Sequence, residues 1–178
     1  MNRLEKNINF LREAYKVARK FSTDKYVQNG AILVRDNTII SSGANKFPDE
    51  VKETEERWKY PLKPFYVSHA ERNAIFNAAK KGIPTEGATM YCPWFACHEC
   101  ADAIINSGIM EVVGHAAPDI WFEAHRKYDD DGKPKKSIWD DSIFHGLIKL
   151  REAGVKLKWI VEEIGGVSII FMGEEMTP

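Results

Sequence analysis

The 178-residue sequence lacks any apolar run of about 18 residues, the length that a membrane-spanning helix requires. Its first residues lead into an amphipathic segment instead of the apolar centre of a secretion signal, so we expect a cytoplasmic protein without a membrane partner. A charge excess is also lacking, since 25 basic side chains face 26 acidic ones. Proteins that bind long nucleic acid usually carry a basic excess, so this balance favours a small-molecule partner.

Cysteine is scarce, and the three cysteines, Cys92, Cys97 and Cys100, lie within nine residues of one another. An odd, clustered set in a cytoplasmic chain favours a metal or catalytic site over disulfide bonds. No internal repeat or low-complexity tract is present. The length and the composition, 44% hydrophobic and 29% charged, are typical of one globular domain, which we expect to span residues 1–178.

The spacing of hydrophobic residues predicts alternating helices and strands. Apolar side chains at steps of three and four predict a helix over residues 4–21, and two apolar runs around the turn signal Asp36-Asn37 predict a hairpin over residues 30–42. Ser68 is a candidate cap for the next helix. Further helices are expected over residues 68–79, 97–107 and 138–153, and further strands over residues 88–92, 110–114, 155–161 and 167–172.

Two segments interrupt this alternation. Residues 46–64 are polar and contain proline, which predicts a long loop. Residues 117–137 contain two prolines and a turn-like Asp-Asp-Asp-Gly string, and we interpret them as an insertion. The remaining order of strands and helices predicts a three-layer α/β/α domain, in which helices cover both faces of one sheet.

Two short motifs stand at expected helix starts. His69-Ala70-Glu71 precedes Cys97-His98-Glu99-Cys100 by 28 residues, counted from His69 to Cys97. Zinc readily takes imidazole nitrogen and thiolate sulfur, and three protein ligands leave a fourth position open for chemistry. The free N–H groups and the positive dipole end of a helix start also favour thiolates there. We therefore expect His69, Cys97 and Cys100 to bind one zinc ion, Zn²⁺.

Glu71 lies two residues after the expected histidine ligand, close enough to reach a water at the metal without binding the metal. We expect it to accept a proton from that water and to pass it on. A Cys-x-x-Cys alone is more often a structural zinc site or a redox site. A structural zinc site needs a fourth protein ligand, for which Cys92 and His98 are the nearby candidates. The conjunction of both motifs favours a catalytic zinc.

At these residues the sequence resembles the cytidine/deoxycytidylate deaminase superfamily, and within it the dCMP deaminases. The resemblance runs from about residue 12 to about residue 165 and is strongest in the strings 69–75 and 89–109. It implies a mixed five-stranded sheet between helices and the hydrolytic conversion of dCMP to dUMP and ammonia. It also implies a homo-oligomer and, in some members, regulation by dCTP and dTTP.

The resemblance carries further site residues. It implies that Asn45 lies near the substrate sugar, and that the backbone around Ala70 and the loop at Trp94 and Phe95 line the base pocket. Asn29 departs from the family, which usually has an apolar residue there. Its amide either faces the pocket and contacts a ring edge or bonds to the backbone of a turn, and the sequence leaves both open.

Two other departures concern the metal loop and the insertion. Ala96 replaces the proline that usually precedes the first cysteine, which removes no ligand. The aromatic and basic side chains of the 117–137 segment either cover a ligand or pack in a subunit interface, and we favour the interface; they are Trp121, Phe122, His125, Arg126 and Lys127. The candidates for contact with a 5′-phosphate are Arg57, Lys59, Lys63, Arg72 and Arg126, although solvated surface charge is the commoner role of such residues.

Three alternative functions stay open. The first is a deaminase of another base, such as a modified cytosine or a purine. The second is an editor of single-stranded nucleic acid, and the third is a non-catalytic, zinc-stabilised regulatory module. The near-neutral charge disfavours the editor, and the presence of Glu71 disfavours the non-catalytic module, because a structural zinc site has no use for an acid there.

Overall fold

A computed structural model of the chain describes residues 1–178 except residues 132, 134 and 136. The helices are α1 (Arg3–Phe21), α2 (Lys63–Tyr66), α3 (Ala70–Lys80), α4 (His98–Asn106), α5 (Ala116–Ala124) and α6 (Ile138–Glu152). The strands are β1 (Gly30–Arg35), β2 (Thr38–Ala44), β3 (Thr89–Tyr91), β4 (Glu111–His115), β5 (Lys156–Ile160), β6 (Ile169–Phe171) and β7 (Glu174–Met176).

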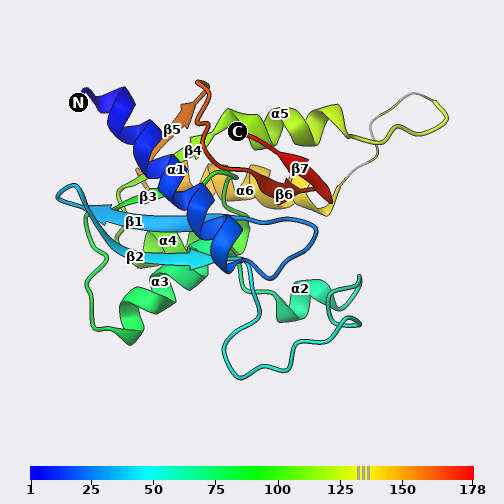
Figure 1. Ribbon diagram of the computed structural model, residues 1–178, viewed down its shortest axis with the longest axis horizontal. Coiled ribbons are helices and arrows are strands. Elements are labelled where there is room, and N and C mark those ends of the chain that lie inside the picture. Colours follow the sequence, from blue (N-terminus) through cyan, green and yellow to red (C-terminus); the bar gives the residue numbers. More distant parts are fainter. Residues whose placement is uncertain (132, 134, 136) are drawn as a thin grey trace.

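The central sheet has five strands in the order β2-β1-β3-β4-β5. Strand β1 pairs antiparallel with β2 and β3, whereas β3, β4 and β5 pair in parallel, so the sheet is mixed. Figure 1 shows α1 crossing in front of β1 and β2, with α4 behind them. The expected three-layer fold with a mixed five-stranded sheet is confirmed.

Successive residues of each strand face opposite helix layers. In β1, Ile32 and Val34 pack with α1, whereas Ala31 and Leu33 pack with α3 and α4. The cluster on the second face holds the expected apolar faces of both motif-bearing helices, and Ala74 of α3 and Ile104 of α4 belong to it. The two helices therefore share one face of the sheet, as the sequence predicts.

Two glycines bring helices unusually close to their neighbours. A Cβ at Gly43 of β2 would fall on backbone atoms of Ala70 and Ala74, so α3 lies directly on the strand. A Cβ at Gly146 of α6 would lie 2.6 Å from the carbonyl oxygen of Ala96. Any side chain at these positions would push α3 or α6 away, which would displace the loops that carry His69 and Cys97.

The structure corrects the expected start of α3. His69, not Ser68, is the N-cap residue, and α3 begins at Ala70. Ser68 cannot cap because its backbone is paired with that of Lys46, in a bridge with hydrogen bonds of 2.9 and 3.2 Å. This bridge closes the segment 46–66, which we call the 46–66 excursion. It consists of the long loop expected over residues 46–64 and the short helix α2 at its end.

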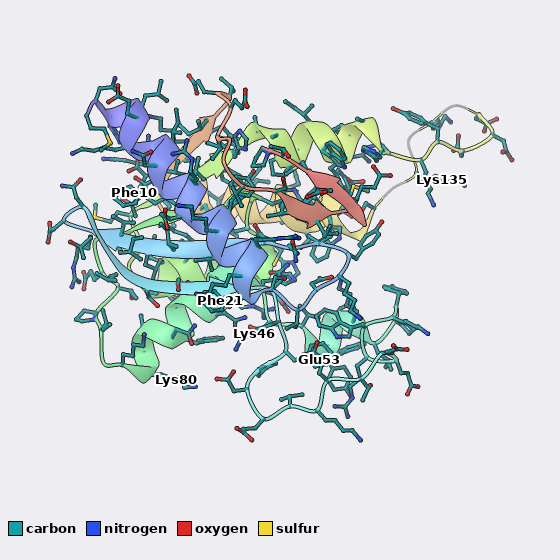
Figure 2. The ribbon with its side chains drawn as sticks, in the orientation of Figure 1. Phe10, Phe21, Lys46, Glu53, Lys80 and Lys135 are labelled. Atoms are coloured by element: carbon teal, nitrogen blue, oxygen red, sulfur yellow. The ribbon has the colours of Figure 1, made fainter. Side chains whose placement is uncertain are left out.

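The C-terminal third also differs from the sequence-based expectation. The segment 117–137 contains most of helix α5. We interpreted this segment as an insertion, and three of its residues, 132, 134 and 136, lie outside the described residues. The expected last strand exists as β6 but pairs with β7, which the sequence did not predict, in a separate two-stranded sheet. Figure 2 places Glu53 on the 46–66 excursion and Lys135 on the outlying loop after α5.

Candidate metal centre and adjoining cavity

The two sequence motifs meet where α3 and α4 begin. His69 is the N-cap residue of α3, Cys97 is the N-cap residue of α4, and Cys100 lies in the first turn of α4. One ligand atom from each lies within 4.8 Å of the others. His69 Nδ1 is 3.4 Å from the sulfur of Cys97 and 3.5 Å from that of Cys100. One nitrogen and two sulfurs can therefore face the same ion.

The electrostatics of the two thiols fit a metal site. Hydrogen bonds from Cys100 and His69 lower the pKa of the Cys97 thiol to about 3, whereas the contact with Cys97 and burial raise the pKa of Cys100. Thiolate is the form that binds zinc, and a nitrogen with two sulfurs is a donor set that zinc accepts.

Glu71 lies beside this group in the first turn of α3. Its side chain is 2% exposed, and its Oε2 has no hydrogen-bond partner among the described residues. Burial raises the pKa of the carboxyl group. An unpartnered buried carboxyl oxygen costs stability unless a ligand or water meets it, so Glu71 is placed for contact with something that enters the cavity.

A cavity of about 730 Å³ adjoins these four residues. His69, Glu71 and Cys97 lie in its wall, whereas Cys100 is fully buried and does not line it. Aromatic side chains make up much of the remaining wall, contributed by four separate segments of the chain: Tyr26, Trp58, Tyr60, Phe65, Trp94, Phe95 and Trp139. Its volume and apolar lining are typical of a small-molecule site.

Asn29 lies in the cavity wall, and the contact of its amide with a substrate ring stays a prediction. It is 5% exposed, and its Nδ2 donates a 3.3 Å hydrogen bond to the sulfur of Cys92. The Cys92 thiol in turn donates to the carbonyl oxygen of Trp94 at 3.1 Å. The amide nitrogen is thus held by Cys92, and no described residue donates to Oδ1 of Asn29, so that oxygen is left as an acceptor.

Asn45 lies in the same wall but also has a structural role. Its Oδ1 accepts from the N–H of Ala70 at 2.9 Å, and its Nδ2 donates to the carbonyl oxygen of Val27 at 3.2 Å. Asn45 therefore ties the start of α3 to the loop before β1. Ala70 itself is fully buried, whereas its neighbours His69 and Glu71 line the cavity, and the expected contact of the backbone around Ala70 with a substrate base stays a prediction.

The five candidates for phosphate contact separate clearly. Lys63 and Arg72 line the cavity, whereas Arg57, Lys59 and Arg126 do not. The guanidinium of Arg57 lies 4.3 Å from the centre of the Tyr66 ring, and Arg126 pairs with Glu123 and Asp140. Trp121 and Phe122 are partly buried against the core cluster that contains Leu11 and Tyr15 of α1, and their expected place in a subunit interface stays a prediction.

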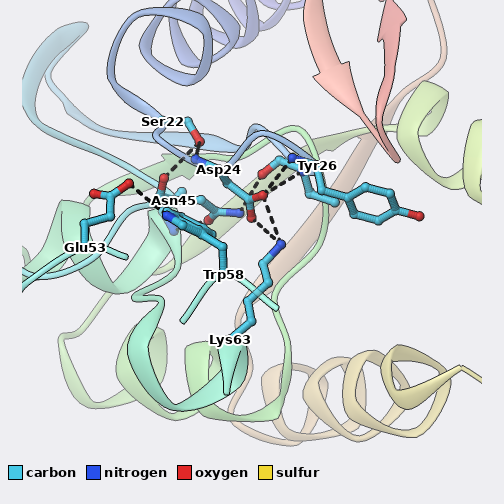
Figure 3. Close-up of polar contacts among 9 residues, drawn as sticks. Ser22, Asp24, Tyr26, Asn45, Glu53, Trp58 and Lys63 are labelled. Atoms are coloured by element: carbon cyan, nitrogen blue, oxygen red, sulfur yellow. Dashed lines mark hydrogen bonds and ion pairs between the residues drawn. The ribbon is translucent and has the colours of Figure 1, made fainter. Parts of the chain in front are cut away.

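The structure adds residues to the site that the sequence analysis missed, and two of them are Trp139 and Asp24. Trp139 of α6 lies 5.5 Å from His69 between ring centres, and nothing in the sequence signals that contact across 70 residues. Asp24 lies in the cavity wall, and its Oδ1 accepts from the N–H groups of Tyr26 and Val27 (Figure 3). An aspartate that bonds to the backbone two and three residues later is a known turn signal, so the sequence did contain a clue to Asp24.

No described helix has both the length and the apolar composition needed to cross a membrane.

Comparison with known proteins places these features in a family. The family model for the cytidine and deoxycytidylate deaminase zinc-binding region matches residues 4–116. A probable deoxycytidylate deaminase of Caenorhabditis elegans is 39% identical over 114 residues, and the human deoxycytidylate deaminase is 36% identical over 115. These alignments cover 61% and 58% of this chain, and 56% and 61% of the relatives' own lengths.

The fold is also found in a solved structure. The dCMP deaminase of the cyanophage S-TIM5, crystallised with dCMP and dUMP, superposes with a TM-score of 0.65 at 22% identity, over 90% of this chain and 99% of that one. At this identity the likeness concerns the fold. Because the family model matches well over half of the chain and includes both motifs, the chain belongs to the cytidine and deoxycytidylate deaminase family.

Proposed function

We propose that the chain is a zinc-dependent hydrolytic deaminase of a cytosine nucleotide, with dCMP as the best substrate. One water and one dCMP would give one dUMP and one ammonia. The observation that carries the proposal is the meeting of His69, Cys97 and Cys100 beside the buried, unpartnered carboxyl of Glu71, at the wall of one cavity. The names of the relatives supply the choice of dCMP.

In this proposal His69, Cys97 and Cys100 hold the zinc. Bound zinc supplies Lewis acidity, which makes a water molecule a nucleophile at neutral pH. The side chains hold their positions through their helices, because two of the three ligands are N-cap residues on a shared packing face. The ring of Trp139 in α6 packs against the ring of His69, with 5.5 Å between the ring centres.

Glu71 moves the protons. Its Oε2 would take one proton from the attacking water and give it to a ring nitrogen of the base. It would then take the proton left on the added oxygen and give it to the amino group, which leaves as ammonia. Burial suits this role, because a raised pKa brings the carboxyl closer to the neutral pH at which it must both accept and release a proton.

Substrate contact falls to Asn29, Asn45, Trp94 and Phe95 in this proposal. The free Oδ1 of Asn29 accepts an N–H of the base, and the second hydrogen of the Asn45 amide is left for the sugar. Trp94 and Phe95 supply apolar faces against the ring, and Trp94 is held by Cys92. The family resemblance adds a homo-oligomer and dCTP or dTTP regulation to the proposal.

The substrate is tested by ammonia release from the wild-type protein on dCMP, CMP, deoxycytidine, adenosine and guanine at equal concentration. We expect dCMP to give the highest kcat/KM, with dUMP formed in equal amount to ammonia. Turnover of adenosine or guanine with none on dCMP would replace the cytosine assignment by the purine alternative. An absence of ammonia from all five would contradict the proposed function.

A further inference from the structure

The cavity has few cations that a charged substrate could meet. Lys63 and Arg72 are the lysine and arginine side chains among the described residues of its wall. Arg72 directly follows Glu71, so it lies at the metal end of the cavity, and its guanidinium pairs with Glu99 at 3.1 Å. Lys63 starts α2 on the excursion that closes the other side.

The ammonium group of Lys63 is held in place by Asp24. Its Nζ lies 2.7 Å from Oδ2 and 2.9 Å from Oδ1 of Asp24, whose side chain is 3% exposed. The rings of Tyr26 and Trp58 each have their centres 5.7 Å from the same Nζ. Figure 3 shows Lys63 reaching from α2 to Asp24, with Tyr26 and Trp58 on either side of it.

This arrangement leaves part of Lys63 available. An ammonium group has three N–H donors, and the pair with Asp24 does not require all of them. Asp24 is further satisfied by the N–H groups of Tyr26 and Val27 at 2.9 and 3.0 Å. Lys63 can therefore donate to a second anion without leaving Asp24 as an unpartnered buried charge, which would be costly.

We propose that Lys63, held by Asp24, is the residue that selects a phosphorylated substrate by donating to its phosphate. The proposal rests on the proposed function. Lys63 touches no reacting atom, so it sets substrate affinity and not the rate of the chemical step. It also screens the Asp24 carboxylate, which without Lys63 would repel a phosphate from the cavity.

The test compares dCMP with deoxycytidine, two substrates that differ only in the phosphate. Lys63→Met is expected to lower kcat/KM on dCMP by about 10- to 100-fold, because the phosphate loses both a hydrogen bond to a charged group and the positive charge itself. The loss should appear in KM with kcat retained, because the phosphate is bound equally in the ground and transition states. kcat/KM on deoxycytidine should stay within about threefold.

Three further variants separate contact from structural support. Lys59→Met removes the same charge from the same excursion, at an exposed residue that does not line the cavity. It should leave kcat/KM unchanged on both dCMP and deoxycytidine. Lys63→Arg should restore most of the activity on dCMP. The double variant Asp24→Asn with Lys63→Met should remain poor on dCMP, because removing the repulsion does not replace the donor.

The outcomes are distinct. An equal loss on dCMP and deoxycytidine in Lys63→Met would mean that Lys63 only supports the fold of the excursion and would overturn the inference. Full recovery of dCMP activity in the double variant would mean that Lys63 acts only by neutralising Asp24, which also overturns it. A wild-type protein inactive on both substrates would contradict the proposed function itself and would be seen before any variant is made.

Discussion

Replacing Glu71 by glutamine is expected to leave the zinc content unchanged and to lower kcat on dCMP by about 10²- to 10⁴-fold, the usual contribution of a general acid–base group. Glutamine keeps the size of the side chain and the packing at the start of α3, but it cannot take a proton from water. Glu71 is not part of the His69, Cys97 and Cys100 group, so the metal should be retained. Zinc is measured by metal analysis and turnover by ammonia release.

A matched substitution controls for the loss of one carboxylate. Glu13→Gln removes the same charge from α1 at a side chain that is 44% exposed and whose partner is Lys16. Both zinc content and turnover should match those of the wild type. The proton-shuttle role would be wrong if Glu71→Gln turned dCMP over at the wild-type rate. Loss of zinc in that variant would instead mean that Glu71 supports the metal site.

Replacing Cys97 by serine should remove both zinc and activity. The serine hydroxyl does not ionise at neutral pH, so the thiolate that its neighbours stabilise at Cys97 is lost. We expect zinc retention below about a tenth of the wild-type level after dialysis, a lower melting temperature, and turnover at least about 10³-fold lower, since metal binding stabilises the fold and supplies the nucleophile. Metal analysis, thermal unfolding and ammonia release check the three effects.

Cys92 offers the control within the same chain. It is buried in the same core cluster as Cys97 and Cys100 but does not belong to the ligand group. Serine at this position can still accept from Asn29 and donate to the carbonyl oxygen of Trp94, so Cys92→Ser should keep its zinc. Equal zinc loss in Cys92→Ser and Cys97→Ser would contradict the assignment of ligands.

The sequence predicts the location of the metal group because local rules decide it. His69 and Cys97 each precede a run of helical hydrophobic spacing, and each is the N-cap residue of its helix in the structure. The strand between them is parallel to β4 and carries both helices to the same face. Spacing along the chain therefore translates directly into proximity in space. The error at Ser68 arose because a bridge to Lys46, 22 residues earlier, holds it in an extended conformation.

The rest of the cavity depends on contacts that local patterns do not record. Asp24 and Lys63 are 39 residues apart and meet only because the 46–66 excursion folds back over the loop before β1. Trp139 lies on a separate helix, α6, and its ring contacts the ring of His69. The orientation of Asn29 was undecidable from sequence because it depends on the Cys92 sulfur 63 residues away. The metal group was thus predictable from the motifs, whereas the pairing of Lys63 with Asp24 and the contact of Trp139 with His69 were not.

One metal ion at His69, Cys97 and Cys100 is expected to make this protein a deaminase. The most direct test is to strip the wild-type protein with a chelator, return zinc in steps, and measure ammonia and dUMP formed from dCMP at each step. We predict that activity disappears on stripping, rises in proportion to added zinc and reaches its plateau at about one zinc per chain, the number that one three-ligand site holds. Full turnover by the stripped protein, or a fully loaded protein that releases no ammonia, would contradict the claim.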